Sequence, residues 1–296
     1  MRVAVLGAGA IGSLIAAKLV VAGYDVLVHG RGEHGAMMAI SGLQITGCWD
    51  KKIESDDWIV SLEGAGLHPS LEGSCDQAII TCKSKDTSDL VGIATFLTKG
   101  PVLSLQNGLG NLEIIKQHVF ENAAVGVTTN AVTRIQPGHI EWVGKGNLVV
   151  GGPKGKEFEK TLECLGASYT EDVSSILWNK LLLNVAINPL AAICGVKNGE
   201  LRSEPLLSQA ESTMIEAANV ARLLGVSVDA DHALLESLHS VLDSTADNIC
   251  SMLADVKAGR ETEIDMLCGQ VVSRGETVGI PTPLNSMLLS QIKSLR

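Results

Sequence analysis

The spacing of apolar and polar positions along this 296-residue chain changes near residue 171. Before that point, short β-branched runs such as 2–6, 25–29 and 76–82 alternate with segments of helical spacing. After it, long segments carry apolar residues at the 3.6-residue period of helices, with few strand signals. The pattern predicts a doubly wound α/β sheet in a domain over residues 1–170 and an all-helical domain over residues 171–296.

Further strands are expected over 101–106, 124–129 and 140–144 because each is a short run rich in β-branched or apolar residues. Residues 37–76 contain alternating segments with several Gly and Asp, and we expect only strands and loops there.

A glycine motif follows the first strand directly and opens the first predicted helix. Gly7 can make the tight turn, Gly9 can let a pyrophosphate approach the backbone, and Gly12 can let the helix pack closely on the strand. The helix N-terminus then offers free N–H groups and a partial positive charge to phosphates. This context predicts a Rossmann-type dinucleotide site whose candidate contacts are Gly7, Ala8, Gly9, Ala10, Ile11 and Gly12.

The end of the second predicted strand indicates which dinucleotide binds. An NAD-specific site places an acidic residue there for the ribose hydroxyls, but this strand ends in Gly30 and Arg31. Arg31 could pair with a 2′-phosphate, which favours NADP(H), although Glu33 is near. The alternative is a solvated loop arginine. Lys83 and Asn107 follow later strands at the ligand-binding edge of such a sheet and are further candidate contacts.

The most apolar segment of the second domain carries a polar stripe. Lys180, Asn184 and Asn188 recur every four residues and share one helical face, while apolar residues cover the rest. Buried polar groups need partners, so we expect a ligand or a polar network opposite the stripe. In the alternative, Lys180 reaches solvent and the two Asn residues cap loops. Pro189 is expected to kink or interrupt the helix.

Composition narrows the function further. The formal net charge of −10 argues against nucleic-acid and anionic-membrane partners and favours small-molecule chemistry. The seven cysteines are scattered without a CxxC pair, so neither a disulfide framework nor a metal site is expected. No secretory signal is recognisable, and the apolar run 181–196 is short for a membrane span. We therefore expect a cytoplasmic protein.

Four motifs closely resemble those of the ketopantoate reductase (2-dehydropantoate 2-reductase) family over nearly the full length. They are GAGAIG at 7–12, LQNGLGN at 105–111, WNKLLLNVAINPLAAICGVKNGEL at 178–201 and SMLADVKAGRETEID at 251–265. The resemblance implies NADPH-dependent reduction of 2-dehydropantoate to (R)-pantoate, a step of pantothenate and coenzyme A biosynthesis.

The resemblance also implies roles for individual residues. Lys180 falls on the catalytic lysine, whose reference pKa of about 10.4 would be lowered by desolvation. The family's substrate contacts correspond to five positions of this chain, which are Lys180 itself, Asn184, Asn188, Asn198 and Ser251. Arg31 falls on the position associated with the NADP phosphate, and positions lining the nicotinamide end fall on Lys83, Asn107, Ala131 and Glu263.

Three other functions stay open from the sequence. The first is the same chemistry on another 2-keto acid. The second is a 6-phosphogluconate or β-hydroxyacid dehydrogenase-like enzyme, which would need a differently spaced lysine motif. The third is a non-catalytic NADP(H) sensor, which would not need the combination of Lys180, Asn184 and Glu263. The sequence leaves monomer and homodimer open.

Overall fold

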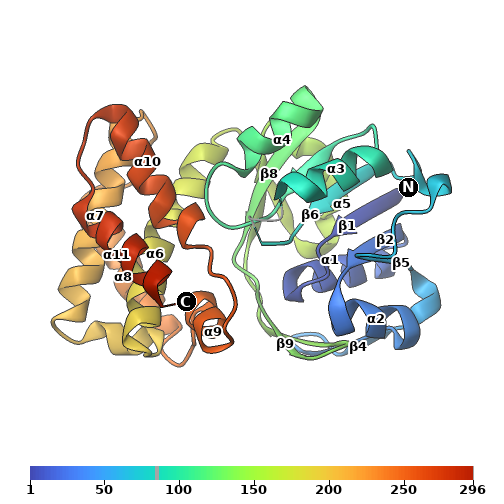
Figure 1. Cartoon of the computed structure of the whole chain (residues 1–296), viewed down its shortest axis with the longest axis horizontal. Coiled ribbons are helices and arrows are strands. Elements are labelled where there is room, and N and C mark those ends of the chain that lie inside the picture. Colours follow the sequence, from blue (N-terminus) through green and yellow to red (C-terminus); the bar gives the residue numbers. More distant parts are fainter. Residues whose placement is uncertain (84–86, 296) are drawn as a thin grey trace. The chain divides into compact units, whose positions relative to one another are not determined.

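The structure is a computed structural model that describes residues 1–83 and 87–295 (Figure 1). Its contacts divide the chain into two compact units. Unit 1 comprises Met1–Gln106 and Asn111–Val173, and unit 2 comprises Asn107–Gly110 and Ser174–Arg296. The short segment Asn107–Gly110 lies between the two parts of unit 1 in the sequence but belongs to unit 2.

Unit 1 is built on an eight-stranded sheet with the strand order β12-β11-β8-β7-β6-β1-β2-β5. The six strands from β8 to β5 in that order are mutually parallel, and β11 runs antiparallel to β8. The bounds are β1 (Arg2–Leu6), β2 (Asp25–Gly30), β5 (Ile59–Leu62), β6 (Gln77–Ile80), β7 (Val102–Ser104), β8 (Ala123–Thr128), β11 (Leu148–Gly151) and β12 (Ala167–Thr170).

Helices cover both faces of this sheet because the strands are apolar on both sides. In β1, Val3 and Val5 join one core cluster with α1, whereas Ala4 and Leu6 join another with α3. Figure 1 shows α1 and α3 on opposite sides of β1. The helix bounds are α1 (Ala10–Val21), α2 (Gly32–Ser41), α3 (Thr87–Leu97), α4 (Asn111–Val119) and α5 (Gly155–Thr161). The predicted doubly wound α/β fold is confirmed.

A second, four-stranded sheet packs beside α1 in unit 1. Its order is β4-β3-β10-β9, and its Ile45 and Ile140 share the core cluster of Leu14 and Ile15 from α1. The bounds are β3 (Leu43–Gly47), β4 (Lys51–Ile53), β9 (Ala131–Gln136) and β10 (His139–Gly144).

The prediction that residues 37–76 hold only strands and loops is wrong at its start, because 37–41 form the last turns of α2. The buried face of α2 consists of His34, Gly35 and Met38. Two of these three residues are not large apolar side chains, so the helical period was hidden from a hydrophobicity pattern.

Unit 2 contains helices and turns, and its described residues include no strand. A single apolar cluster joins α6 to α7, α8, α10 and α11. Within that cluster Leu182, Val185 and Ala186 of α6 are fully buried. The bounds are α6 (Val173–Cys194), α7 (Leu206–Leu223), α8 (Asp231–Ser244), α9 (Ser251–Lys257), α10 (Cys268–Val278) and α11 (Pro283–Ser294). The prediction of a helical C-terminal region is confirmed.

Of the two effects expected of Pro189, a kink or an interruption, the interruption does not occur: α6 continues for five residues beyond it to Cys194. Proline inside a helix removes one hydrogen bond and costs about 3 kcal/mol. Leu190 and Ala191 beyond it are buried in the same cluster as Val185 and Ala186 before it. Each large apolar side chain that becomes buried contributes about 1.5–3 kcal/mol, so packing on both sides of Pro189 outweighs the lost bond.

α6 is also the one described helix that is long and apolar enough to cross a membrane by length and composition. In its most apolar window, 61% of the residues are buried within the protein. Core helices of soluble proteins pass the same test, so this feature is weak support for a membrane span.

Candidate active site

The glycine turn of unit 1 has the geometry that a dinucleotide phosphate requires. Gly7 has φ +105°, and a Cβ there would lie 2.6 Å from the backbone nitrogen of Cys82. A Cβ on Gly12 would lie 2.2 Å from the Gly7 carbonyl oxygen, so α1 packs against the turn itself. Around Gly9 a Cβ would meet no atom within 4 Å. The backbone at Gly9 is therefore the open part of the turn.

The N-terminus of α1 adds donors to this opening. Gly9 is the N-cap residue of α1, and no side chain caps the helix there. The first N–H groups of a helix lack intrahelical acceptors, and with the helix dipole they attract anions. The residues present thus fit the pyrophosphate of a dinucleotide.

The other cofactor candidates of unit 1 follow the carboxyl ends of parallel strands. Arg31 follows β2 and is exposed, Lys83 follows β6 and is half-buried, and Ala131 opens β9 three residues after β8. Because β2, β1 and β6 are adjacent in the sheet, their ends meet at the edge where open α/β sheets bind ligands. The structure therefore places Gly7, Arg31 and Lys83 at one edge of unit 1.

In unit 2 the polar stripe of α6 faces a small pocket. Asn184 and Asn188 line it together with the Ser251 and Asp255 side chains of α9, and Glu263 lies on its wall. The full lining is Asn107, Asn184, Asn188, Ser251, Met252, Asp255, Glu263 and Leu267. Five sequence-predicted site residues, Asn107, Asn184, Asn188, Ser251 and Glu263, thus meet at one place.

Lys180 lies one turn before Asn184 on the same face of α6. Burial lowers the pKa of its ammonium from 10.5 to about 8, while the negative charge of Glu263 opposes that shift. Lys180 itself does not contribute to the pocket lining, but the charge of Glu263, which does, acts on it. The arrangement gives a lysine that can release and regain its proton near neutral pH.

The 107–110 segment brings Asn107 to this pocket. Its side-chain amide donates to Glu263 Oε2 over 3.2 Å. The next residue, Gly108, has φ +83°, and a Cβ there would lie 2.4 Å from the Met266 carbonyl oxygen. Leu109 then donates its N–H to that same Met266 oxygen. A glycine is therefore required at 108 to seat Asn107 against Glu263.

Asn198 is not among the residues that line the pocket, although it was predicted as a substrate contact. It begins a short 3-10 helix over Asn198–Arg202 and is buried. Its side-chain nitrogen donates to Thr245 Oγ1 over 3.0 Å, and its backbone N–H donates to the Asn248 carbonyl.

Three lining residues had no predicted role: Met252, Asp255 and Leu267. Met252 and Leu267 form the apolar part of the wall, and both are buried. Asp255 is a buried carboxylate whose Oδ1 lies 3.0 Å from Arg260 Nε. Its four-residue spacing from Ser251 in a helix was a signal that could have placed it on the same face.

Among the residues that the structure describes, no group of three or more His, Cys, Asp or Glu side chains is arranged to hold a metal ion. The polar side chains at the pocket are three amides, one hydroxyl, two carboxylates and the nearby lysine. Such a set suits the binding of a small polar molecule and the transfer of a proton.

Comparison with known families and proteins adds independent information. The family model described as "Ketopantoate reductase PanE/ApbA" matches residues 3–155, and "Ketopantoate reductase PanE/ApbA C terminal" matches residues 172–296. A 2-dehydropantoate 2-reductase of Pyrococcus horikoshii is 35% identical, across 99% of this chain and 97% of that protein.

Solved structures are also similar to this chain. A PanE/ApbA family ketopantoate reductase from Ralstonia eutropha aligns with a TM-score of 0.88 at 30% identity, covering 100% of this chain and 98% of the other. A D-mandelate dehydrogenase bound to NADH and anilino(oxo)acetate aligns with a TM-score of 0.90 at 23% identity, covering 100% and 98%. The second likeness shows a shared fold alone.

Proposed function

Because the chain belongs to the ketopantoate reductase family, an oxidoreductase family, we propose that it reduces 2-dehydropantoate to (R)-pantoate with NADPH. The observation that carries this proposal is the pocket of unit 2. It joins Asn184, Asn188 and Ser251 to Glu263, whose charge acts on a lysine of lowered pKa. The reaction belongs to pantothenate and coenzyme A biosynthesis.

The proposed cofactor is supported by the glycine turn and by Arg31. The open backbone at Gly9 and the uncapped start of α1 would hold the pyrophosphate. Arg31 follows β2, where an NAD-specific site places an acid, so its guanidinium would pair with the 2′-phosphate. Glu33, two residues further, is the acid nearest in sequence and is exposed.

Lys180 supplies the proton of the proposed reaction. When bound, NADPH supplies the hydride that goes to the 2-keto carbon. Negative charge grows on the carbonyl oxygen, and the Lys180 ammonium stabilises that charge and then donates a proton to it. A pKa of about 8 lets the ammonium be present at neutral pH and still release its proton readily.

The remaining pocket residues orient the substrate. Asn184, Asn188 and Ser251 offer amide and hydroxyl donors to a carboxylate and acceptors to a hydroxyl. Glu263 accepts a hydrogen bond from the Asn107 amide. Its negative charge near Lys180 favours the protonated form of the lysine. Holding the keto acid in one orientation raises the rate of proton and hydride transfer, because the entropy of alignment is lost on binding and not in the transition state.

The test is a panel of 2-keto acids with two reduced cofactors. Purified protein is incubated with NADPH or NADH and with 2-dehydropantoate, trimethylpyruvate or phenylglyoxylate, and cofactor oxidation is followed. We expect the highest kcat/KM for 2-dehydropantoate with NADPH and (R)-pantoate as the product. The Lys257→Ala variant, which removes an exposed lysine of α9, serves as the control for Lys180 variants.

Each outcome of the panel separates the alternatives. Turnover of phenylglyoxylate or trimethylpyruvate without turnover of 2-dehydropantoate would assign the chain to another 2-keto acid. NADPH binding without any turnover would favour a non-catalytic sensor. A preference for NADH would leave the reaction in place and remove the proposed role of Arg31.

A further inference from the structure

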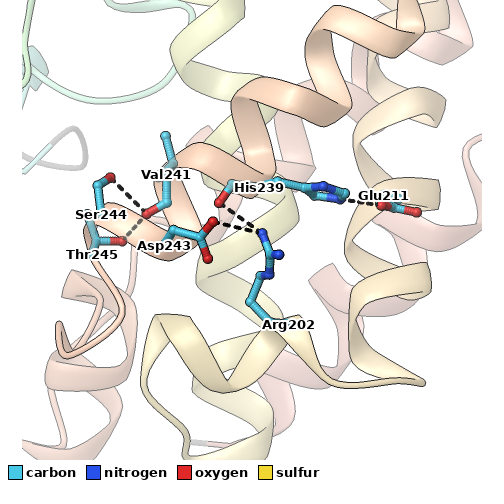
Figure 2. A network of polar contacts seen from close by, with 7 residues as sticks. All are labelled: Arg202, Glu211, His239, Val241, Asp243, Ser244 and Thr245. Atoms are coloured by element: carbon cyan, nitrogen blue, oxygen red, sulfur yellow. Dashed lines mark hydrogen bonds and ion pairs between the residues drawn. The ribbon is translucent and has the colours of Figure 1, made fainter.

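A surface network holds the segment that carries Asn198 against the C-terminal end of α8 (Figure 2). The Arg202 side chain, four residues after Asn198, donates to the His239 carbonyl oxygen over 3.3 Å and to Asp243 Oδ2 over 3.1 Å. His239 Nε2 in turn lies 2.6 Å from Glu211 Oε1 of α7. The short helix over Asn198–Arg202 is thus tied to α8, and α8 to α7.

The backbone at Asn198 is held by hydrogen bonds within this framework. Its own N–H donates to the Asn248 carbonyl, and the N–H of Gly199 donates to the Ala246 carbonyl. With the backbone held at Asn198 and Gly199 and the residue buried, the orientation of the side-chain amide group decides which of its atoms a ligand could meet.

Thr245 fixes that orientation. Its hydroxyl donates to the Val241 carbonyl oxygen over 2.6 Å, as Figure 2 shows, so its one proton is already engaged. Towards Asn198 the Thr245 oxygen can therefore only accept, and it accepts from Asn198 Nδ2 over 3.0 Å. The amide NH₂ must face Thr245, and Oδ1 must face the other way.

Asn198 Oδ1 is a buried acceptor that still needs a donor. The residue is 7% exposed, and among the residues that the structure describes Oδ1 has no hydrogen-bond partner. Leaving such an atom unsatisfied is costly, so an O–H or N–H group from a ligand would gain by meeting it. Carboxylate and ketone oxygens of a 2-keto acid only accept, whereas a substrate hydroxyl can donate.

We propose that Thr245 is a positioning residue that presents Asn198 as a hydrogen-bond acceptor and thereby selects 2-keto acids that carry a hydroxyl group. The inference rests on the proposed function and adds to it a contact between Asn198 Oδ1 and the hydroxyl group of the substrate. Without the Thr245 hydroxyl the amide can turn over and direct NH₂ at the ligand. The preference for a hydroxyl donor then weakens, while binding of the keto acid group persists.

The test compares two keto acids that differ by one hydroxyl group. 2-Dehydropantoate carries it and trimethylpyruvate lacks it, and kcat/KM is measured for both with NADPH. In Thr245→Val we expect kcat/KM for 2-dehydropantoate to fall about tenfold, the value of one well-aligned hydrogen bond. For trimethylpyruvate we expect a change below about twofold, because that acid has no hydroxyl to lose.

Two further variants separate positioning from general destabilisation. Thr245→Ser keeps the hydroxyl, and we expect it to restore the selectivity of the wild type. Ser244→Ala is the matched control: the Ser244 hydroxyl also donates to the Val241 carbonyl, over 3.2 Å, but within the described part of the chain no hydrogen bond joins it to Asn198. We expect Ser244→Ala to keep the selectivity ratio. If Thr245→Val does not fold, Thr245→Ala replaces it, with folding checked by thermal melting.

The outcomes distinguish this inference from the function on which it rests. Turnover of neither keto acid by the wild type would overturn the proposed function, and this inference with it. Turnover by the wild type with an unchanged ratio in both Thr245→Val and Thr245→Ala would overturn the positioning role alone. Equal loss on both acids would do the same, because a purely structural role lowers both rates together.

Discussion

The candidate sites of the two units are built from different parts of the chain. In unit 1 six consecutive residues, 7–12, form the turn at which a phosphate would bind. The groups offered are the N–H groups at the start of α1, since those of Gly7, Ala8 and Gly9 donate to backbone carbonyl oxygens. In unit 2 the pocket is lined by side chains from α6, α9 and the segments around Asn107 and Glu263. The first site is local in sequence, whereas the second is assembled from residues more than 150 positions apart, as the Asn107–Glu263 hydrogen bond shows.

This difference sets how each site should respond to substitution. A backbone site tolerates most side-chain changes but fails where a Cβ fills the space of the ligand or of packed backbone. A side-chain site loses a specific charge or donor with each truncation, and its fold persists if the core beneath is untouched. Substitutions in the two sites therefore test that contrast.

Truncation of the lysine should separate chemistry from cofactor binding most clearly. We expect Lys180→Ala to lower kcat roughly 10³-fold, since it removes both the proton donor and the charge that stabilises the oxyanion. The affinity for NADPH, measured by fluorescence titration, should change little because the glycine turn lies in unit 1. Near-normal kcat in Lys180→Ala, with Lys257→Ala as the control, would contradict the catalytic assignment.

Arg31 offers the corresponding test in unit 1. We expect Arg31→Ala to raise KM for NADPH about 10- to 100-fold, the loss of one charge-assisted contact to a phosphate, and to leave KM for NADH unchanged. Arg134→Ala removes another exposed arginine of unit 1 and should alter neither value. Parallel rises in both KM values for Arg31→Ala would show that the guanidinium does not read the 2′-phosphate.

The pKa of Lys180 predicts opposite pH trends for activity and stability. Proton donation needs the ammonium, so kcat/KM for reduction should fall about tenfold per pH unit above about 8. Stability should behave in the reverse way. The folded-state pKa lies below the unfolded value of about 10.4, so between those values the unfolded chain binds more protons and stability rises with pH.

Measurements of the rate and of urea unfolding across pH 7 to about 10.5 check both trends. In Lys180→Met the stability increment should disappear, because the titrating group is gone. A rate profile that stays flat through pH 9 would show that a group other than Lys180 supplies the proton.

Local sequence patterns predicted most of the fold. The run at Arg2–Leu6, the glycine turn and the helix after it follow one another without gaps, so neighbours in sequence define that part of the structure. The helix α2 was not predicted because its buried residues include His34 and Gly35, which are not large apolar residues and so give no helical hydrophobic pattern. The sequence left open whether the helix continues through Pro189, because burial on both sides of it is a tertiary effect.

The pocket likewise contains residues that a local pattern groups together and residues that only tertiary packing brings together. The helical period placed Lys180, Asn184 and Asn188 on one face, but no local pattern pairs Asn107 with Glu263. The contact of Asn198 with Thr245, 47 residues away, depends on the packing of α8 against the short helix over Asn198–Arg202. Partner choice at such distances is decided by tertiary packing, so the sequence indicated Asn107, Asn198 and Glu263 without their partners and gave no role to Thr245.

The smallest expected effect comes from two glycines of the same turn, which separate ligand space from packing space. A Cβ on Gly9 meets no atom within 4 Å and φ there is −81°, so Gly9→Ala should fold with an unchanged Tm. The added methyl would occupy space beside the proposed pyrophosphate and raise KM for NADPH about fivefold, a cost of roughly 1 kcal/mol.

Gly12→Ala should do the reverse, because its Cβ would lie 2.2 Å from the Gly7 carbonyl and 2.4 Å from Thr81 Oγ1. Overpacking of this kind costs about 1–3 kcal/mol, which lowers Tm by about 2–10 °C in a chain of this size. Thermal melting and NADPH kinetics of the two variants give the comparison. If Gly9→Ala leaves KM for NADPH unchanged, the open backbone at Gly9 is not where the phosphates bind, and the site of unit 1 must rest on side chains after all.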